Sequence, residues 1–126
     1  MGEKIKIVFT LKREQFLKTD IKSAWEFFSD PGNLSEITPP WLNFKIVSPL
    51  PEKMYQGMIV EYRVHPFLGI PVKWITEITH VKEPFFFVDE QRFGPYKFWH
   101  HKHFFKEIDG RVHMTDEVHY LLPMGF

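Results

Sequence analysis

The chain has 126 residues, a length that fits one domain with a single hydrophobic core. Its 16 basic and 16 acidic residues cancel and form no basic run, which argues against nucleic acid and against an anionic membrane surface as partners. The lack of cysteine excludes disulfides and thiolate metal sites and fits a cytoplasmic protein. Charges recur along the N-terminal stretch, so it predicts neither a signal peptide nor a membrane span.

The N-terminal third predicts one strand followed by two short helices. Apolar residues alternate with polar ones from Ile5 to about Thr19, which indicates the strand. Asp20 is a favourable N-cap for a first helix that stops by residues 30–32. The apolar face of this helix would carry Ile21, Ala24, Trp25 and Phe28. Residues 33–37 predict a second short helical stretch, ended by two prolines.

The rest of the chain predicts strands joined by turns. A short strand is expected at 44–48, and the next ones carry Met58, Val60, Tyr62 and Val64 on one face, then Val72, Trp74, Thr76 and Ile78. An aromatic hairpin at 85–108 and a last strand at 111–122 follow. The whole predicts an α+β domain with one curved antiparallel sheet of about six to seven strands.

The aromatic hairpin can be oriented from its charges. Lysine is rarely buried, so the face with Lys102 and Lys106 should meet water, and the odd-numbered residues between 99 and 105 should point inward. In the preceding strand, Glu90 and Arg92 suit solvent, which places residues 87, 89 and 91 inward. Both strands therefore present aromatic and polar side chains to one interior.

The turn at Asp109-Gly110 fixes the pairing of the last two strands. Asp-Gly is a strong signal for a two-residue hairpin turn, in which Ile108 faces Arg111. The numbers of opposed residues then sum to a constant, which places His103 opposite Asp116. A polar cluster is expected on the inner face, composed of Asp89, Gln91, His101, His103 and Asp116.

This polar cluster has three interpretations. It is a structural hydrogen-bond network, or it orients a ligand, or His101, His103 and Asp116 form an acid–base set for enolisation or dehydration. The two histidines could also bind a metal with Asp116 or Asp89 as a third ligand, since they lie two apart on one strand face. His-x-His alone is a weak signal, so no metal and no cofactor are assigned.

The inward aromatic residues are either ordinary core or the lining of an apolar pocket. We expect the ligand-binding set to comprise these aromatic residues and two polar ones: Trp41, Phe44, Tyr62, Trp74, Phe87, Asp89, Gln91, Trp99, Phe105 and Tyr120. The sequence contains no nucleophile elbow, phosphate-binding glycine loop or dinucleotide fingerprint.

The order of elements resembles the START-like, helix-grip superfamily, in its polyketide cyclase/dehydrase-like (SRPBCC) branch. The segments that carry the resemblance are WEFFSDPGNLSEITPPWL (25–42), PFLGIPVKWITEI (66–78), DEQRFGPYKFWHHKHFF (89–105) and DEVHYLLPMGF (116–126). The resemblance implies an antiparallel sheet curled around a long C-terminal helix, with a hydrophobic cavity between them. Such folds host unrelated functions, so function must be argued from the site.

The sequence departs from the family pattern at its end. The long helix follows a segment like Leu122–Phe126 in the family, and this single START-like domain, residues 1–126, stops there. The leading hypothesis is binding of a small hydrophobic molecule, such as a lipid, isoprenoid or polyketide-like compound. The alternatives are a cyclase/dehydratase enzyme and a regulatory interaction domain with a vestigial cavity. Because the inner face would lack its usual cover, a homodimer that buries it is expected.

Overall fold

The computed structural model describes residues 8–33, 45–67 and 70–121 of the chain. In this part, one helix, one 3-10 turn and a seven-stranded antiparallel sheet make up the fold, and the strand order is β1-β7-β6-β5-β4-β3-β2. The elements are β1 (Phe9–Leu17), α1 (Ile21–Phe28), a 3-10 turn (Pro31–Asn33), β2 (Lys45–Ile46), β3 (Ile59–Phe67), β4 (Ile70–Lys82), β5 (Phe86–Phe93), β6 (Phe98–Ile108) and β7 (Arg111–Leu121). The predicted α+β class and its curved antiparallel sheet are confirmed.

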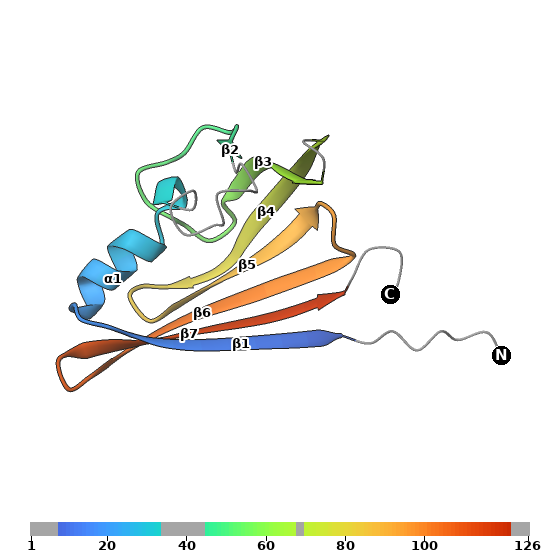
Figure 1. Cartoon of the computed structure of the whole chain (residues 1–126). Coiled ribbons are helices and arrows are strands. Elements are labelled where there is room, and N and C mark those ends of the chain that lie inside the picture. The colour runs from blue at the N-terminus through green and yellow to red at the C-terminus, as the bar shows by residue number, and fades with distance from the viewer. Residues whose placement is uncertain (1–7, 34–44, 68–69, 122–126) are drawn as a thin grey trace.

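Helix α1 begins where the sequence predicts and lies across one end of the sheet (Figure 1). The Asp20 carboxylate accepts hydrogen bonds from the backbone N–H of Ser23 at 2.7 Å and from its hydroxyl at 3.1 Å, which caps the helix. Trp25 is buried and meets the rings of Phe87 and Phe105 edge-on, each at a centroid distance of 5.7 Å. This contact holds the helix on the face of the sheet that we call the inner face.

The core has two parts, both on the inner face. Beneath α1, Phe87 and Phe105 pack with side chains from β7. Between β3 and β4, a second cluster buries Met58, Val60, Tyr62 and Ile78, which are the inward residues expected from their alternation. Farther from α1, the inner face is less covered, and Phe9 and Leu11 on the edge strand β1 are exposed.

The turn residues between β6 and β7 determine how these two strands pair. Asp109 and Gly110 both have positive φ angles, 51° and 74°, which a two-residue turn of this kind needs. Ile108 pairs with Arg111, and the register places His103 opposite Asp116, as predicted.

Several boundaries differ from those expected. The first strand ends at Leu17 rather than Thr19, and its predicted start at Ile5 lies outside the described residues. The first predicted helix is found as α1, which stops before residues 30–32 as expected, and a 3-10 turn follows at Pro31–Asn33. Residues 34–37 of the second predicted helix lie outside the described residues. Within the described residues no long helix follows β7, and none of their helices is long and apolar enough to cross a membrane.

Candidate functional site: a histidine–aspartate cluster on the inner face

Three neighbouring strands bring two histidines and two aspartates together. Asp89 comes from β5, His101 and His103 from β6, and Asp116 from β7. Because side chains two apart on a strand share a face, the two histidines lie side by side. The register sets Asp89 beside His101 on one flank and Asp116 beside His103 on the other. The predicted inner-face cluster is therefore present, except that Gln91 stands apart from it.

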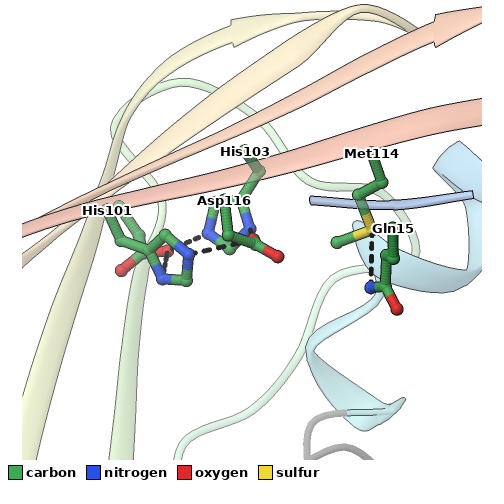
Figure 2. Close-up of polar contacts among 6 residues, drawn as sticks. Gln15, His101, His103, Met114 and Asp116 are labelled. Atoms are coloured by element: carbon green, nitrogen blue, oxygen red, sulfur yellow. Dashed lines mark hydrogen bonds and ion pairs between the residues drawn. The ribbon is translucent and has the colours of Figure 1, made fainter. Parts of the chain in front are cut away.

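Each histidine of the cluster lies between the carboxylates of Asp89 and Asp116. Figure 2 shows the side on which Asp116 meets both rings. The Oδ1 atom of Asp116 is 3.0 Å from Nε2 of His101 and 3.2 Å from Nδ1 of His103. On the other side, Oδ2 of Asp89 is 2.6 Å from Nε2 of His103 and 3.8 Å from Nδ1 of His101. The expected pairing of Asp116 with a histidine on β6 is thus found with both.

Aromatic contacts hold the two imidazoles in place. The rings of His101 and His103 stack with centroids 3.6 Å apart, and His103 also stacks on Phe87 at 4.0 Å with an interplanar angle of 12°. Trp99 meets His101 edge-on at 6.3 Å. A ring on each side therefore limits the rotation of both histidines, which is what a preorganised site requires.

The electrostatics of the cluster favour a protonated His103. Burial lowers the pKa of this imidazole, but hydrogen bonds to Asp116 and Asp89 and the charges of both carboxylates outweigh burial, so the pKa lies above its usual value. Burial also raises the pKa of Asp116, yet the hydrogen bonds from His101 and His103 hold it well below its ordinary range. A neutral imidazole has a single N–H, so a ring with carboxylates at both nitrogens gains by carrying a second proton.

Asp89 and Tyr62 complete the electrostatic environment. Burial raises the pKa of Asp89, but the charge of His101 and the hydrogen bond from His103 outweigh it, so the net pKa is lowered. Burial, and secondarily the charge of Asp89, raises the pKa of the buried Tyr62 phenol. Tyr62 therefore stays neutral at physiological pH and keeps its O–H proton for hydrogen bonding.

A second group of rings lies beyond the cluster, at the end of the sheet away from α1. Trp99 meets Trp74 at 5.4 Å, Tyr96 at 4.8 Å and Tyr120 at 6.0 Å between ring centroids. Phe9 of the edge strand stacks on Tyr120 at 5.6 Å. We call these five residues the distal aromatic group. None of them is fully buried, so they offer apolar surface next to the polar cluster.

The predicted ligand-binding residues divide between several environments. Tyr62, Phe87 and Phe105 are buried in the core, while Trp74, Trp99 and Tyr120 belong to the distal aromatic group. Gln91 donates its amide N–H to the carbonyl oxygen of Tyr96 and accepts the backbone N–H of the same residue at 3.1 Å, so it braces the β5–β6 connection. Trp41 and Phe44 lie outside the described residues.

Tyr96 is a member of the distal aromatic group that the sequence pattern does not predict. It lies in the β5–β6 connection, which the pattern treats as a turn with no inward or outward face. The connection spans residues 94–97, Gln91 holds the backbone of Tyr96, and the Tyr96 ring contacts Trp99 on the inner face. A glutamine five residues before an aromatic turn residue is the one local signal, and it is weak.

A hollow of about 660 Å³ lies beside α1, away from the polar cluster. Its walls combine the buried Trp25 with charged residues of α1, of the 52–54 segment and of the β4–β5 turn. None of the predicted ligand-binding residues lines it. Because acidic and basic side chains line it, this hollow suits a hydrophobic ligand less well than the distal aromatic group does.

The fold has counterparts among solved structures. No protein-family model matches the sequence, and no curated protein matches it. Ginseng major latex-like protein 151 from Panax ginseng superposes with a TM-score of 0.67 at 16% identity, over 91% of this chain and 80% of that chain. Protein CV1439 from Chromobacterium violaceum has a TM-score of 0.68 at 13% identity, over 93% and 82%.

A third match extends the set to a mycobacterial protein. Protein Ms6760 from Mycobacterium smegmatis has a TM-score of 0.66 at 23% identity, over 86% of this chain and 70% of that chain. At these identities the likeness concerns the fold, and it agrees with the helix-grip resemblance seen in the sequence. Which molecule occupies the inner face must be argued from this chain's own residues.

Proposed function

We propose that this chain, which has the START-like helix-grip fold, binds a small hydrophobic molecule on the inner face of its sheet. The observation that carries the proposal is the distal aromatic group, which places five incompletely buried rings beside a fixed polar cluster. Apolar surface with a few convergent polar groups is the usual composition of a small-molecule site. The ligand class would be a lipid, isoprenoid or polyketide-like compound, held in a cytoplasmic protein.

The arrangement of the face suggests how such a ligand would lie. Its apolar part would cover Trp99 and the neighbouring rings, while an oxygen would reach toward His101 at the near edge of the cluster. Of the two histidines, His101 has the looser contact with Asp89, 3.8 Å against 2.6 Å for His103. A hydrogen bond from His101 to a ligand oxygen would therefore disrupt less of the existing network.

A binding experiment tests the proposal. Organic extracts of purified protein, analysed by mass spectrometry, should contain a co-purifying apolar molecule, and the uncharged probe Nile red should bind with a rise in fluorescence. Trp99→Asp should weaken probe binding by about tenfold or more, since it puts a charge among the rings. The matched control is Phe98→Asp, the adjacent residue on the outer face, which should bind the probe like the wild type.

The outcome that would overturn the binding function is specific. If both variants are folded and bind the probe equally well, the distal aromatic group is not the binding surface. If no probe binds to the wild type and no molecule co-purifies, the inner face does not act as a carrier site, and the regulatory interaction domain becomes the better interpretation.

An enzymatic role is the second candidate, favoured by the loose Asp89 contact at Nδ1 of His101. A general base needs a nitrogen that can reach substrate, and at 3.8 Å this one is beyond hydrogen-bonding distance of its carboxylate. A cyclase/dehydratase step would begin with enolisation of a ketone. Deuterium exchange at the α-carbon of a bound ketone, followed by NMR, should then depend on His101 and not on the outer-face His119.

A further inference from the structure

The histidine–aspartate cluster has the donor set of a metal centre. One donor atom from each of Asp89, His101 and His103 lies within 4.8 Å of a donor atom from each of the other two. Both nitrogens that face Asp89, Nδ1 of His101 and Nε2 of His103, approach the same oxygen, Oδ2. Three donors that converge on one small volume from two adjacent strands can bind one ion.

Asp116 supplies an independent indication, because it contacts the opposite nitrogen of each ring. Its Oδ1 atom accepts from Nε2 of His101 at 3.0 Å and from Nδ1 of His103 at 3.2 Å. Histidines that bind metals commonly donate their second ring N–H to a carboxylate, which fixes the tautomer and the ring orientation. In this cluster one carboxylate does so for both rings, and the other nitrogen of each ring faces Asp89.

We propose that Asp89, His101 and His103 bind a divalent first-row transition-metal ion, with Zn²⁺ the ion that fits best, and that Asp116 positions the two imidazoles. Two imidazoles and one carboxylate suit zinc and its neighbours, whereas Ca²⁺ and Mg²⁺ prefer sites made of oxygen ligands. Three protein ligands leave a coordination position for water or a ligand oxygen. The inference does not depend on the proposed hydrophobic ligand.

The distances require only small side-chain movements. Bonds of about 2.0–2.2 Å in a tetrahedral zinc site place neighbouring donors roughly 3.3 Å apart. The Asp89–His103 pair, now at 2.6 Å, would open, and the Asp89–His101 pair, at 3.8 Å, would close. The ion would take the place of the proton between Asp89 and His103, so binding releases a proton. The stacking of Phe87 on His103, and of His103 on His101, keeps the rings aligned during this exchange.

The outer face of the same strands offers matched controls. His100 lies 3.3 Å from Glu90, and His119 lies 2.8 Å from Glu117, each a single histidine beside a single carboxylate. These pairs also join an imidazole to a carboxylate in partly buried positions, but each lacks a second imidazole that shares its carboxylate. Removing His100 or His119 should therefore leave a cluster-bound ion in place.

The test uses the full chain, with any purification tag removed and any metal stripped by a chelator. Titration with Zn²⁺ by calorimetry should show one ion per chain, and Co²⁺ should give the visible absorption of a low-coordinate site. His101→Ala, His103→Ala and Asp89→Ala should each weaken binding by about 100-fold or more, and Asp116→Asn by about 10–100-fold. His100→Ala and His119→Ala should match the wild type.

A measurement on the unmodified chain covers the case in which a cluster variant fails to fold. Zn²⁺ should raise the melting temperature of the wild type, and Co²⁺ should broaden the NMR signals of Phe87 and Trp99 before those of the outer-face Phe98 and Phe104. No saturable binding by the folded wild type would overturn the proposal. Binding lost in His119→Ala but kept in His101→Ala would do the same. Because these readouts need no hydrophobic ligand, failure of the metal site is distinguishable from failure of the proposed binding function.

Discussion

The Nδ1 atom of His103 lies 3.2 Å from Oδ1 of Asp116, directly across the β6–β7 ladder. The same carboxylate oxygen receives Nε2 of His101 at 3.0 Å. Both histidines of the cluster are thus held from one side by one residue, and the other side is left to Asp89. Every buried side-chain nitrogen or oxygen within the described ranges has a hydrogen-bond partner, so the cluster is satisfied as it stands.

Replacing Asp116 with asparagine should destabilise the metal-free protein. The substitution keeps the shape and one acceptor oxygen but removes the charge that both histidines face, and since hydrogen bonds to a charged group contribute more than neutral ones, we expect a loss of about 1–3 kcal/mol in the free energy of unfolding. Urea denaturation measures the change. The matched control is the next residue, Glu117→Gln, whose contact with His119 lies on the outer face, and we expect its effect to stay within about 0.5 kcal/mol. Equal effects of the two variants would mean that the cluster contributes little to stability.

Trp25 should be the main anchor of α1. Trp25→Ala removes a buried ring that contacts Phe87 and Phe105, and such changes cost about 3–5 kcal/mol in the free energy of unfolding. Trp25→Phe should restore part of this loss. Phe27 lies on the exposed side of the same helix, so Phe27→Ala should cost much less. Thermal denaturation followed by circular dichroism ranks the stability of the three variants. If Trp25→Ala is no less stable than Phe27→Ala, the assignment of Trp25 to the core is contradicted.

The helix cap makes stability depend on pH in the acid range. Hydrogen bonds from the backbone and side chain of Ser23 hold the pKa of Asp20 below its ordinary value of 3.8. A carboxyl whose pKa is depressed in the folded state stabilises the protein above its unfolded pKa, and this contribution is lost as pH falls through the folded pKa. As pH falls from 5 to below the ordinary Asp pKa of 3.8, the wild type should therefore lose more stability than Asp20→Asn, whose amide oxygen still caps the helix without titrating.

The control for the cap is another exposed carboxylate. Glu107 is exposed on β6, so the stability of Glu107→Gln should fall with decreasing pH in parallel with that of the wild type. Melting temperatures measured at a series of pH values for the three proteins check the prediction. Parallel curves for the wild type and Asp20→Asn would show that the cap does not contribute through its charge.

Self-association through the inner face is a further expectation, since α1 covers one end of that face. Leu11 on the inner side of β1 is 55% exposed, and Phe16 on the outer side of the same strand is also 55% exposed. If two copies bury their inner faces together, Leu11→Lys should shift the chain toward monomer, whereas Phe16→Lys should not. Multi-angle light scattering measures the mass directly. A monomeric wild type, or equal effects of the two variants, would argue against the homodimer.

The sequence by itself determined which residues of β6 point to the inner face and how β6 pairs with β7. Lys102 and Lys106 belong in water, and because side chains alternate along a strand, this assigned His101, His103 and Phe105 to the inner face. The Asp109-Gly110 turn then set His103 opposite Asp116, since a two-residue turn leaves a single register for the strands it joins. These conclusions needed no knowledge of distant contacts.

Only the tertiary structure decided how the other side of the cluster closes and which rings become core. The β5–β6 connection is longer than the β6–β7 turn, and the register of β5 and β6 depends on the contacts of Gln91 with the backbone of Tyr96. The sequence pattern therefore did not reveal that Asp89 reaches His103. Phe87 and Phe105 share the inner face with Trp99, and their spacing in the sequence does not show which of these rings becomes buried. The contacts of Trp25 decide it, because the short helix α1 covers only one end of the sheet. There it buries Phe87 and Phe105, and it leaves the distal aromatic group open.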